Sequence, residues 1–420
     1  MEVVGITGIG SELQGVGRLR DGRAAFVPFS IPGEVVEVEI ARDCGRYVEA
    51  RAVRIVEPSP ARVEPDCPVY GLCGGCQARH MAYAESLVWK RRRVEDALRR
   101  LGGFENPDVR PTIGVRDPLR ARNKAEYAIQ DGVIGAFRPG SREVVPLSDC
   151  LLQRPESAAA LKQLSRMNLA GLRFAVTRVN RGGEMMLTLS GDGGRPPFSA
   201  FPGAKSLYCC KLRPRPRHAL DGECRHISGA ERLEEALLGL RFSLHPQSFF
   251  QVNAEQAERM YTIALDALEL RGDEAVLDAY AGAGTITLAA AQRAKAAVGV
   301  EISKPAVDDA KESARRNGLA DRARFVLGDA AVEIPKLAKG GMRFDAAILD
   351  PPRRGADASV LGELIRLSPA RVAYVSCDPG TLARDLKRLC EGGYALQWAQ
   401  PVDMFAYTGH VETVAFMTWA

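Results

Sequence analysis

The sequence predicts a multidomain protein with an N-terminal β-barrel, an α+β central part and a C-terminal α/β domain. The chain has 420 residues, more than a single hydrophobic core usually organises. Residues 1–56 alternate apolar and polar side chains at the period of half-buried strands, whereas helix-like and strand-like segments alternate from residue 254 onward. Three cysteines within residues 67–76 mark the part in between.

The first 56 residues form the predicted barrel. Period-two alternation is clearest at residues 35–40 and 51–56, and glycines separate the short apolar runs. We expect a closed, OB-like barrel of about five strands, because closure leaves no strand edge open to other chains. Three prolines within residues 58–65 then indicate a linker. The first domain is therefore placed at residues 1–56 and the central domain at 57–245.

The central domain is expected to mix one helix with several strands. A helix is predicted at about residues 82–101, and we expect it to pack on the C-terminal domain. Glycine-rich, strand-like stretches follow, with the clearest at residues 125–129, 133–137 and 185–189.

Residues 246–420 are predicted to fold as a doubly wound, Rossmann-like α/β domain. Alternation of helices and buried strands is typical of a parallel sheet covered on both faces. The predicted helices lie at about 254–270, 285–294, 304–317, 359–366 and 381–391. The predicted strands lie at about 275–278, 297–301, 324–327, 345–350, 371–376, 394–400 and 411–418.

Such sheets bind ligands beyond the carboxyl ends of their strands. The first strand is followed by Gly282 and Gly284, which let the backbone approach a ligand, and the second ends in Glu301, which suits ribose hydroxyls. The fourth ends in Asp350, aimed into the crevice by two prolines. A nicotinamide dinucleotide is the competing ligand, but Thr287 stands where its motif has a third glycine. These loops favour S-adenosylmethionine.

Cys377 follows the fifth strand and lies beside this crevice. A thiolate can add to C6 of a pyrimidine and turn C5 into a nucleophile that accepts a methyl group. The C5 proton must then leave, which requires a general base, and Glu412 at the start of the last strand is the candidate. Taken singly, a cysteine at a strand end is more often a small buried hydrophobe, and a glutamate an exposed charge.

The spacing Cys67-x5-Cys73-x2-Cys76, with Cys150 further along, suits either tetrahedral zinc or an iron–sulfur cluster. The Cys-x3-Cys-x2-Cys pattern of radical S-adenosylmethionine enzymes is absent. A reducing compartment argues against a disulfide framework. The other cysteines are therefore expected to be packing residues or surface thiols: Cys44, Cys209, Cys210, Cys224 and Cys390.

Composition and charge indicate the partners. No apolar run is long enough to cross a membrane and the N-terminus lacks a secretory signal, so we expect a cytoplasmic protein without a membrane partner, and a monomer. The net charge is only +5, but cations cluster at residues 90–93, 211–217 and 353–354. Such clusters either follow RNA phosphates or form a solvated surface.

Several motifs, taken together and in order, resemble the RNA uracil-C5 methyltransferases. The resemblance is to the iron–sulfur type that makes 5-methyluridine in 23S ribosomal RNA, which has tRNA-acting relatives. It covers essentially the whole chain, and residues 15–40 look like the RNA-binding TRAM domain. The motifs are Cys67-Pro-Val-Tyr-Gly-Leu-Cys-Gly-Gly-Cys76, Arg122-Asn-Lys-Ala-Glu-Tyr127, Phe249-Phe-Gln-Val-Asn253, Asp350-Pro-Pro-Arg353, Ser376-Cys-Asp-Pro379 and His410-Val-Glu-Thr413.

This resemblance implies a role for individual residues. It implies that residues 246–420 form a class I methyltransferase domain, with Cys377 as the nucleophile and Glu412 as the base. We expect the target uracil to be extruded from its stack, and Phe250 either stacks on it or packs in the core. It implies S-adenosylmethionine contacts from Gln251, Tyr280, Glu301 and Asp350. It also implies a structural [4Fe-4S] cluster held by Cys67, Cys73, Cys76 and Cys150.

Four functions are compared at this point. The favoured one is methylation of C5 of a specific uridine in 23S ribosomal RNA, and the first alternative is the same chemistry on tRNA. The second is a non-catalytic RNA-binding iron–sulfur protein, which leaves Cys377 and Glu412 unexplained. A dinucleotide oxidoreductase would explain Glu301 and the glycines but not Asp350 and Cys377.

Overall fold

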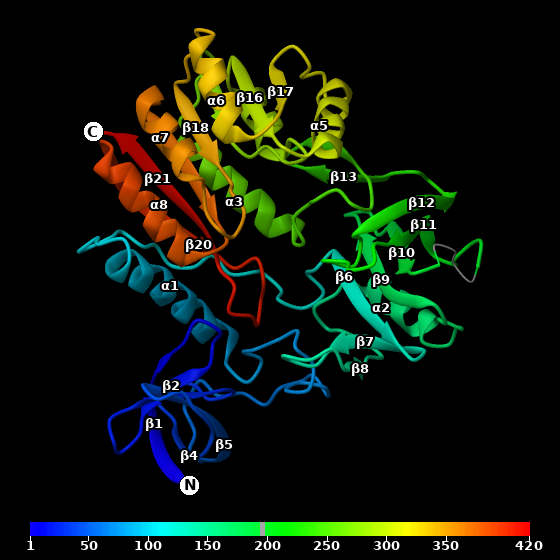
Figure 1. Cartoon of the computed structure of the whole chain (residues 1–420), viewed down its shortest axis with the longest axis vertical. Coiled ribbons are helices and arrows are strands. Elements are labelled where there is room, and N and C mark those ends of the chain that lie inside the picture. The colour runs from blue at the N-terminus through cyan, green and yellow to red at the C-terminus, as the bar shows by residue number, and fades with distance from the viewer. Residues whose placement is uncertain (194–197) are drawn as a thin grey trace.

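A computed structural model describes residues 1–193 and 198–420, and it begins with a closed barrel (Figure 1). The strands pair in the order β1-β2-β3-β5-β4, and β4 closes on β1. On β4, Val36 and Val38 are buried inside while Glu37 and Glu39 alternate with them. The predicted five-stranded barrel is confirmed. Its strands are β1 (Glu2–Ile9), β2 (Gly15–Arg18), β3 (Ala24–Val27), β4 (Val35–Asp43) and β5 (Tyr47–Glu57).

The central part is a seven-stranded sheet with one helix packed against it. The strand order is β12-β11-β10-β9-β6-β7-β8, and α2 (Pro155–Leu164) buries Leu161 and Leu164 against the sheet. The sequence pattern did not predict α2, because so short a helix has few turns in which to repeat its apolar period. The strands are β6 (Lys124–Gln130), β7 (Val133–Phe137), β8 (Val144–Pro146), β9 (Leu172–Val179), β10 (Met185–Gly191), β11 (Ala204–Leu212) and β12 (Gly222–Gly229).

A hairpin of β13 (Leu233–Leu237) and β14 (Leu240–Leu244) precedes the C-terminal sheet. Leu240 and Phe242 belong to the same buried cluster as Ala310 of that sheet's helix layer. The hairpin therefore packs with the C-terminal domain, although the predicted boundary groups it with the central one.

The C-terminal domain is a seven-stranded sheet with helices on both faces. The strand order is β17-β16-β15-β18-β19-β21-β20, and the first five strands are parallel. The strands are β15 (Ala275–Asp278), β16 (Ala296–Glu301), β17 (Ala323–Leu327), β18 (Ala346–Leu349), β19 (Arg371–Ser376), β20 (Tyr394–Val402) and β21 (Glu412–Trp419). The helices are α3 (Ala254–Ala267), α4 (Thr285–Arg293), α5 (Lys304–Arg316), α6 (Ala330–Lys339), α7 (Ala358–Leu367) and α8 (Pro379–Glu391).

The sheet differs from the predicted all-parallel arrangement at one edge. The last strand, β21, lies between β19 and β20 and runs antiparallel to both. No helix separates β20 from β21 in the chain, so the connection can only return antiparallel. The sequence also missed α6, which contains a helix-breaking proline, Pro335.

Helix α1 (Tyr83–Arg100) connects the barrel to the C-terminal domain (Figure 1). Its residues Val94 and Leu98 are fully buried in the same cluster as Leu382 and Leu386 of α8. None of the helices in the described ranges has both the length and the apolar character needed to cross a bilayer.

Candidate functional site

The carboxyl ends of β15, β16, β18 and β19 meet at one edge of the parallel sheet. Asp278 and Glu301 end two of these strands, while Asp350 and Cys377 directly follow the other two. Residues far apart in the chain therefore share one crevice, as expected for a doubly wound sheet.

The loop after β15 has the shape that its glycines permit. Gly282 and Gly284 have φ angles of +53° and +83°, in the left-handed region that favours glycine. A Cβ on Gly284 would lie 2.8 Å from the ring of Phe325, whereas a Cβ on Gly282 would meet nothing within 4 Å. Gly284 is thus fixed by packing, and Gly282 borders open space in which a ligand can lie.

Glu301 is tied directly to this loop. Its Oε2 accepts a hydrogen bond from the backbone N–H of Gly282 at 3.0 Å, and its Oε1 accepts one from Ser303 at 2.7 Å. The carboxylate is held beside the loop, where it can accept hydrogen bonds from the hydroxyl groups of a ligand.

Asp278 and Thr287 form a support that sequence reasoning missed. The Thr287 hydroxyl donates to Asp278 Oδ2 at 2.6 Å, and the Tyr280 backbone N–H donates to Oδ1 at 3.2 Å. Asp278 is only 1% exposed, and burial raises its pKa to about 6 despite these hydrogen bonds. Thr287 stands where the dinucleotide-binding motif has its third glycine, and its hydroxyl instead stabilises the loop through Asp278.

The remaining predicted cofactor residues are Gln251, Tyr280 and Asp350. Gln251 donates through Nε2 to the Tyr261 hydroxyl at 3.2 Å. The Tyr280 hydroxyl accepts a hydrogen bond from the Asp357 backbone N–H at 3.3 Å. The pKa of Asp350 lies well above its ordinary value, first because of burial and then because of the charges of Glu412 and Asp278.

Strand pairing brings Cys377 and Glu412 together. Ser376 of β19 pairs with Thr413 of β21, so the next pair in this antiparallel register is Cys377 opposite Glu412. Burial raises the pKa of Cys377 to about 11, and the negative charges of Glu412 and Asp350 add to this effect. In the free protein the sulfur is therefore held as a thiol.

Glu412 is buried rather than exposed. The side chain belongs to a residue that is 5% exposed, and this burial raises its pKa to about 7, although the cations Arg353 and Lys90 act in the opposite direction. A carboxyl that titrates near neutral pH beside a thiol is suited to accept and release a proton.

The loop that leads to Glu412 is held by Asp403, a residue to which the sequence analysis gave no role. Lys90 and Tyr83 of α1 both donate to the Asp403 carboxylate, Tyr83 at 2.6 Å. Lys90 also donates to the carbonyl oxygen of Phe405 at 3.0 Å. Both ions of the Lys90–Asp403 pair are fully buried, and a buried pair of this kind is strongly destabilised when one partner is removed.

The exposed aromatic residue beside the crevice is Phe249, not Phe250. Phe250 is 5% exposed and packs against Phe242 in the hydrophobic core, with ring centroids 5.7 Å apart. Phe249 is 71% exposed. Of the two roles considered for Phe250, the structure therefore supports core packing and not stacking on a uracil, because the ring is buried among core side chains.

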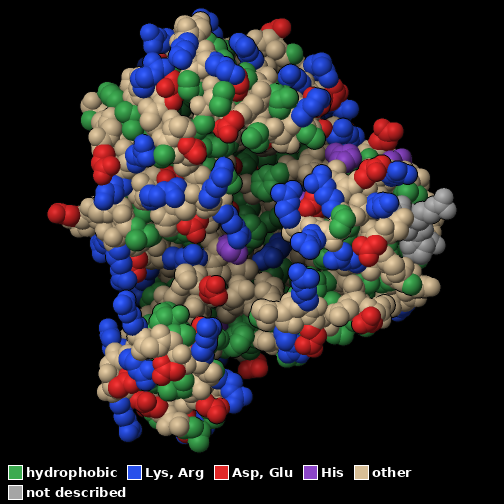
Figure 2. Space-filling model, in the orientation of Figure 1, with side chains coloured by type: hydrophobic (Ala, Val, Ile, Leu, Met, Phe, Trp, Pro, Cys, Tyr) green, Lys and Arg blue, Asp and Glu red, His purple; other side chains and the backbone are tan. Residues whose placement is uncertain are grey.

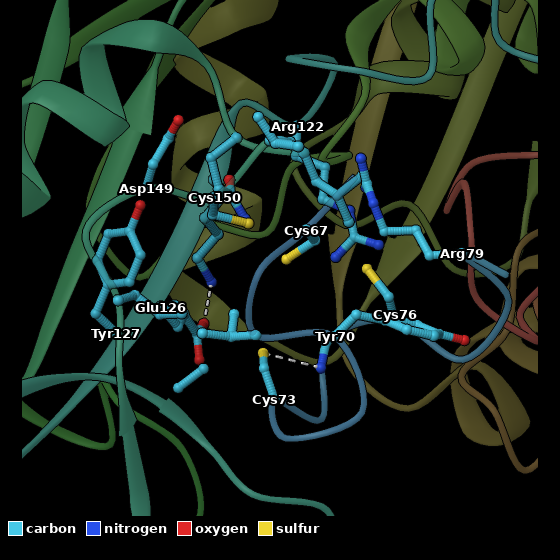
Figure 3. Close-up of a pocket in the computed structure, with 18 of the residues that line it drawn as sticks. Cys67, Tyr70, Cys73, Cys76, Arg79, Arg122, Glu126, Tyr127, Asp149 and Cys150 are labelled. Atoms are coloured by element: carbon cyan, nitrogen blue, oxygen red, sulfur yellow. Dashed lines mark hydrogen bonds and ion pairs between the residues drawn. The ribbon is translucent and has the colours of Figure 1, made fainter. Parts of the chain in front are cut away.

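The four predicted ligand cysteines line one cavity of about 350 Å³ in the central part (Figure 3). Cys67, Cys73 and Cys76 lie on the loop before α1, and Cys150 comes from the segment after β8. Figure 3 shows their sulfur atoms spread around a common space rather than meeting at one point. Within residues 1–193 and 198–420, no three His, Cys, Asp or Glu side chains lie close enough to hold a single metal ion.

Two cysteines behave differently from the expectation. Cys210 of β11 and Cys224 of β12 are opposite each other in the antiparallel register and are joined by a disulfide. The pairing could not be read from a sequence separation of 14, because strand register decides which side chains meet.

Comparison with known families covers both ends of the chain. Residues 230–419 match the family model described as tRNA (Uracil-5-)-methyltransferase, and residues 3–53 match the TRAM domain. A protein of Halalkalibacterium halodurans described as an uncharacterized RNA methyltransferase is 37% identical, over 94% of this chain and 92% of its own. Another from Clostridium tetani is 36% identical over 99% of this chain and 95% of its own.

One solved structure is similar over its whole length. The Pyrococcus abyssi tRNA (uracil-54, C5)-methyltransferase, in complex with S-adenosyl-L-homocysteine, superposes with a TM-score of 0.79. Its sequence is 26% identical, and the match covers 100% of both chains.

The burial of Glu412 predicts a pH-dependent gain in stability for the substitution Glu412→Gln. Folding raises this pKa from its ordinary value of 4.5 to about 7. The raised pKa therefore does not destabilise the folded protein below pH 4.5, where the carboxyl is protonated in both states, and it destabilises the folded protein most above pH 7, where the carboxyl is ionised in both states. The neutral glutamine should therefore increase the free energy of unfolding at pH 8 by up to about 3 kcal/mol relative to pH 5.

Urea unfolding at the two pH values, followed by the fluorescence of Trp398 and Trp419 in β20 and β21, measures this difference. Glu391→Gln, at the exposed end of α8, is the control, because that carboxylate stays in water on folding. A stability difference for Glu412→Gln that does not change with pH would show that this carboxyl is not desolvated in the folded protein.

Proposed function

The chain belongs to the family of TRAM-containing RNA methyltransferases, and from this premise we propose that it methylates C5 of a uridine in RNA through a covalent adduct with Cys377. S-Adenosylmethionine is the methyl donor of the family, and the similar archaeal enzyme was solved with the demethylated product of that donor. The observation that carries the proposal is the pairing of β19 with β21, which sets Cys377 opposite Glu412 at the cofactor edge of the sheet.

The proposed reaction begins at the sulfur of Cys377. The thiol gives its proton to solvent, and the resulting thiolate adds to C6 of the uracil, which places electron density on C5 as an enolate. C5 then attacks the methyl group of S-adenosylmethionine, and S-adenosylhomocysteine leaves. Because the thiolate and the methyl group must reach C6 and C5 from the faces of the ring, the target base has to leave its RNA stack, and the exposed ring of Phe249 is available to contact it.

Glu412 is the proposed general base for the final step. After methylation C5 carries both a methyl group and a proton, and the C–S bond breaks only when that proton is removed. A buried carboxyl with a pKa near 7 accepts the proton readily, because its charged form is not strongly favoured by solvent. The elimination then returns Cys377 and leaves 5-methyluridine.

The proposed cofactor residues surround the loop of Gly282. Glu301 is positioned to accept the ribose hydroxyls, since it already faces this loop. Gln251, Tyr280 and Asp350 line the remaining sides of the crevice in this proposal. The hydrogen bonds of Glu301 to Gly282 and Ser303 hold its carboxylate in place, which reduces the entropy that this side chain would lose on binding the cofactor.

The cysteine cavity is proposed to hold a structural [4Fe-4S] cluster. A single zinc ion needs its thiolates about 2.3 Å away, so the four sulfurs would have to crowd around one point. A cubic cluster instead presents its four irons at separate corners, which fits thiols spread around a cavity of about 350 Å³. With four cysteine ligands the cluster would link the 67–76 loop to the central sheet.

Ribosomal RNA of the 23S type is the proposed substrate, and tRNA is the alternative. The combination of a TRAM barrel with a cysteine cavity supports the ribosomal proposal, whereas the archaeal enzyme of similar structure is named for a tRNA uridine. Folded RNA of either kind would be held mainly through its phosphates and its shape.

Replacing Cys377 by Ala should abolish methyl transfer and every covalent protein–RNA adduct, because the proposed reaction begins with attack of this sulfur on C6. The measurement is tritium transfer from labelled S-adenosylmethionine to total RNA, with 5-fluorouridine-containing RNA to trap the adduct on denaturing gels. Cys390→Ala, a half-buried cysteine on α8, should keep both signals. Full turnover by Cys377→Ala would refute the proposed chemistry.

Replacing Glu412 by Gln should slow the release of the methylated RNA from Cys377 rather than the attack of Cys377 on C6. The methylated adduct should accumulate on denaturing gels with unmodified RNA, and turnover should fall by at least about 100-fold, the usual contribution of a general base. Normal turnover without accumulation would assign the base to another residue.

Anaerobically purified protein should show a broad absorption near 400 nm and about four irons per chain if the cavity holds the proposed cluster. Cys73→Ser should lose both, whereas Cys44→Ser, in the barrel, should lose neither. Stoichiometric zinc without visible absorption would overturn this part of the proposal.

Mapping of 5-methyluridine decides between the two RNA classes. In cells that lack the gene, the modification should disappear from 23S ribosomal RNA and stay in tRNA, and the gene for Cys377→Ala should fail to restore it. Loss from tRNA alone would favour the alternative substrate.

A further inference from the structure

The loop between β11 and β12 carries a dense group of exposed cations. Residues 211–218, here called the arginine loop, read Lys-Leu-Arg-Pro-Arg-Pro-Arg-His and contain no acidic residue. Lys211, Arg213, Arg215 and Arg217 are all exposed. Proline restricts the backbone before and after Arg215, so the three arginines are presented on a stiff segment.

A single buried carboxylate fixes the shape of this loop. Asp221 Oδ2 accepts hydrogen bonds from the backbone N–H of Arg217 at 3.0 Å and from the Nε of the same arginine at 3.1 Å. The Nε of Arg213 lies 3.7 Å from Asp221 Oδ1. The Asp221 side chain is only 7% exposed, whereas those of Arg213 and Arg217 are 69% and 78% exposed. The carboxylate therefore organises the loop from beneath while the guanidinium groups remain in water.

The loop is also attached firmly to the protein body. The Ser190 hydroxyl donates to the carbonyl of Ala219 at 2.6 Å, and Ala219 and Leu220 are buried against Val176. At the base of the loop the Cys210–Cys224 disulfide joins its two strands. An exposed cationic loop held in this way loses little conformational entropy when it binds a ligand.

The same loop lies next to the segment that leads into the cofactor crevice. Gln247 donates through Nε2 to the carbonyls of Leu220 and Gly222, each at 3.0 Å. The exposed Phe249 and the buried Gln251 follow Gln247 within four residues of the same segment. In Figure 2, Lys and Arg side chains gather along the rim of the hollow between the C-terminal domain above and the central part at the right.

We propose that the arginine loop is a phosphate-binding element that holds the RNA strand flanking the target uridine. Lys211 and Arg215 have no ion-pair partner among the described residues, so their charges are available to a polyanion. Arginine binds phosphate through two parallel hydrogen bonds, and lysine binds it as a point charge. Together, Arg215 and Lys211 can therefore fix the position of a strand. This inference rests on the proposed function, since it assigns part of the RNA footprint of the same site.

The test is RNA affinity as a function of salt for the double variant Lys211→Gln/Arg215→Gln. Fluorescence anisotropy with a labelled RNA stem-loop that has an all-uridine loop gives the binding constant. Loss of two phosphate contacts should lower the slope of log affinity against log salt by about 2 and weaken binding about tenfold or more at low salt. The conservative Arg215→Lys should keep most of the slope.

The matched control removes one lysine and one arginine elsewhere. Arg324 and Lys339 are exposed and lie at the amino edge of the catalytic sheet, opposite the edge that carries Cys377. Arg324→Gln/Lys339→Gln should bind RNA like the original protein, and all variants should bind S-adenosylmethionine with equal affinity.

Two results would overturn the assignment of the loop while leaving the proposed function intact. One is an unchanged salt slope in Lys211→Gln/Arg215→Gln, and the other is an equal loss in the control, which would reflect overall charge alone. If the original protein binds no RNA at any salt concentration, the proposed function fails together with the loop.

Discussion

The antiparallel pairing of β21 with β19 is the constraint on which the candidate active site depends. A parallel sheet delivers its loops to one edge, but only from strands that run in the same direction. Because β21 runs in the opposite direction, its first residue, Glu412, arrives at the edge where β19 ends in Ser376 and Cys377. A shift of the register by one residue would turn Glu412 to the other face of the sheet and away from the thiol.

Burial sets the chemistry of this edge. Asp278, Asp350 and Glu412 all have raised pKa values, and in each case desolvation is the largest cause. Such a group of carboxyls is unfavourable for folding, and Lys90 and Arg353 offset only part of it. The same desolvation raises the pKa of Cys377 to about 11, so that the thiol form is favoured at neutral pH.

The barrel side and the catalytic side of the molecule are joined by buried charges rather than by apolar packing alone. Lys90 and Tyr83 of α1 reach across to Asp403, next to the loop that precedes Glu412. Arg122 lines the cysteine cavity and also lies over the ring of Phe405, with its guanidinium carbon 5.8 Å from the ring centroid. The cysteine cavity and the active-site loop therefore have Arg122 in common, so a change in the structure of one is expected to alter the position of the other.

The sequence alone determined the main architecture and supplied the candidate site residues. Period-two and helical alternation predicted the barrel and nearly all elements of the catalytic sheet, because those patterns reflect which face of an element is buried. Motif resemblance supplied the proposed roles of Cys377, Glu412 and the cluster cysteines. What only the tertiary structure decided was direction, register and burial: the antiparallel course of β21, the Asp403 cluster and the Cys210–Cys224 pair. The exposure of Phe249 rather than Phe250 belongs to the same group. These features depend on contacts between residues far apart in the chain, and a local pattern contains no information about which distant side chains it will meet.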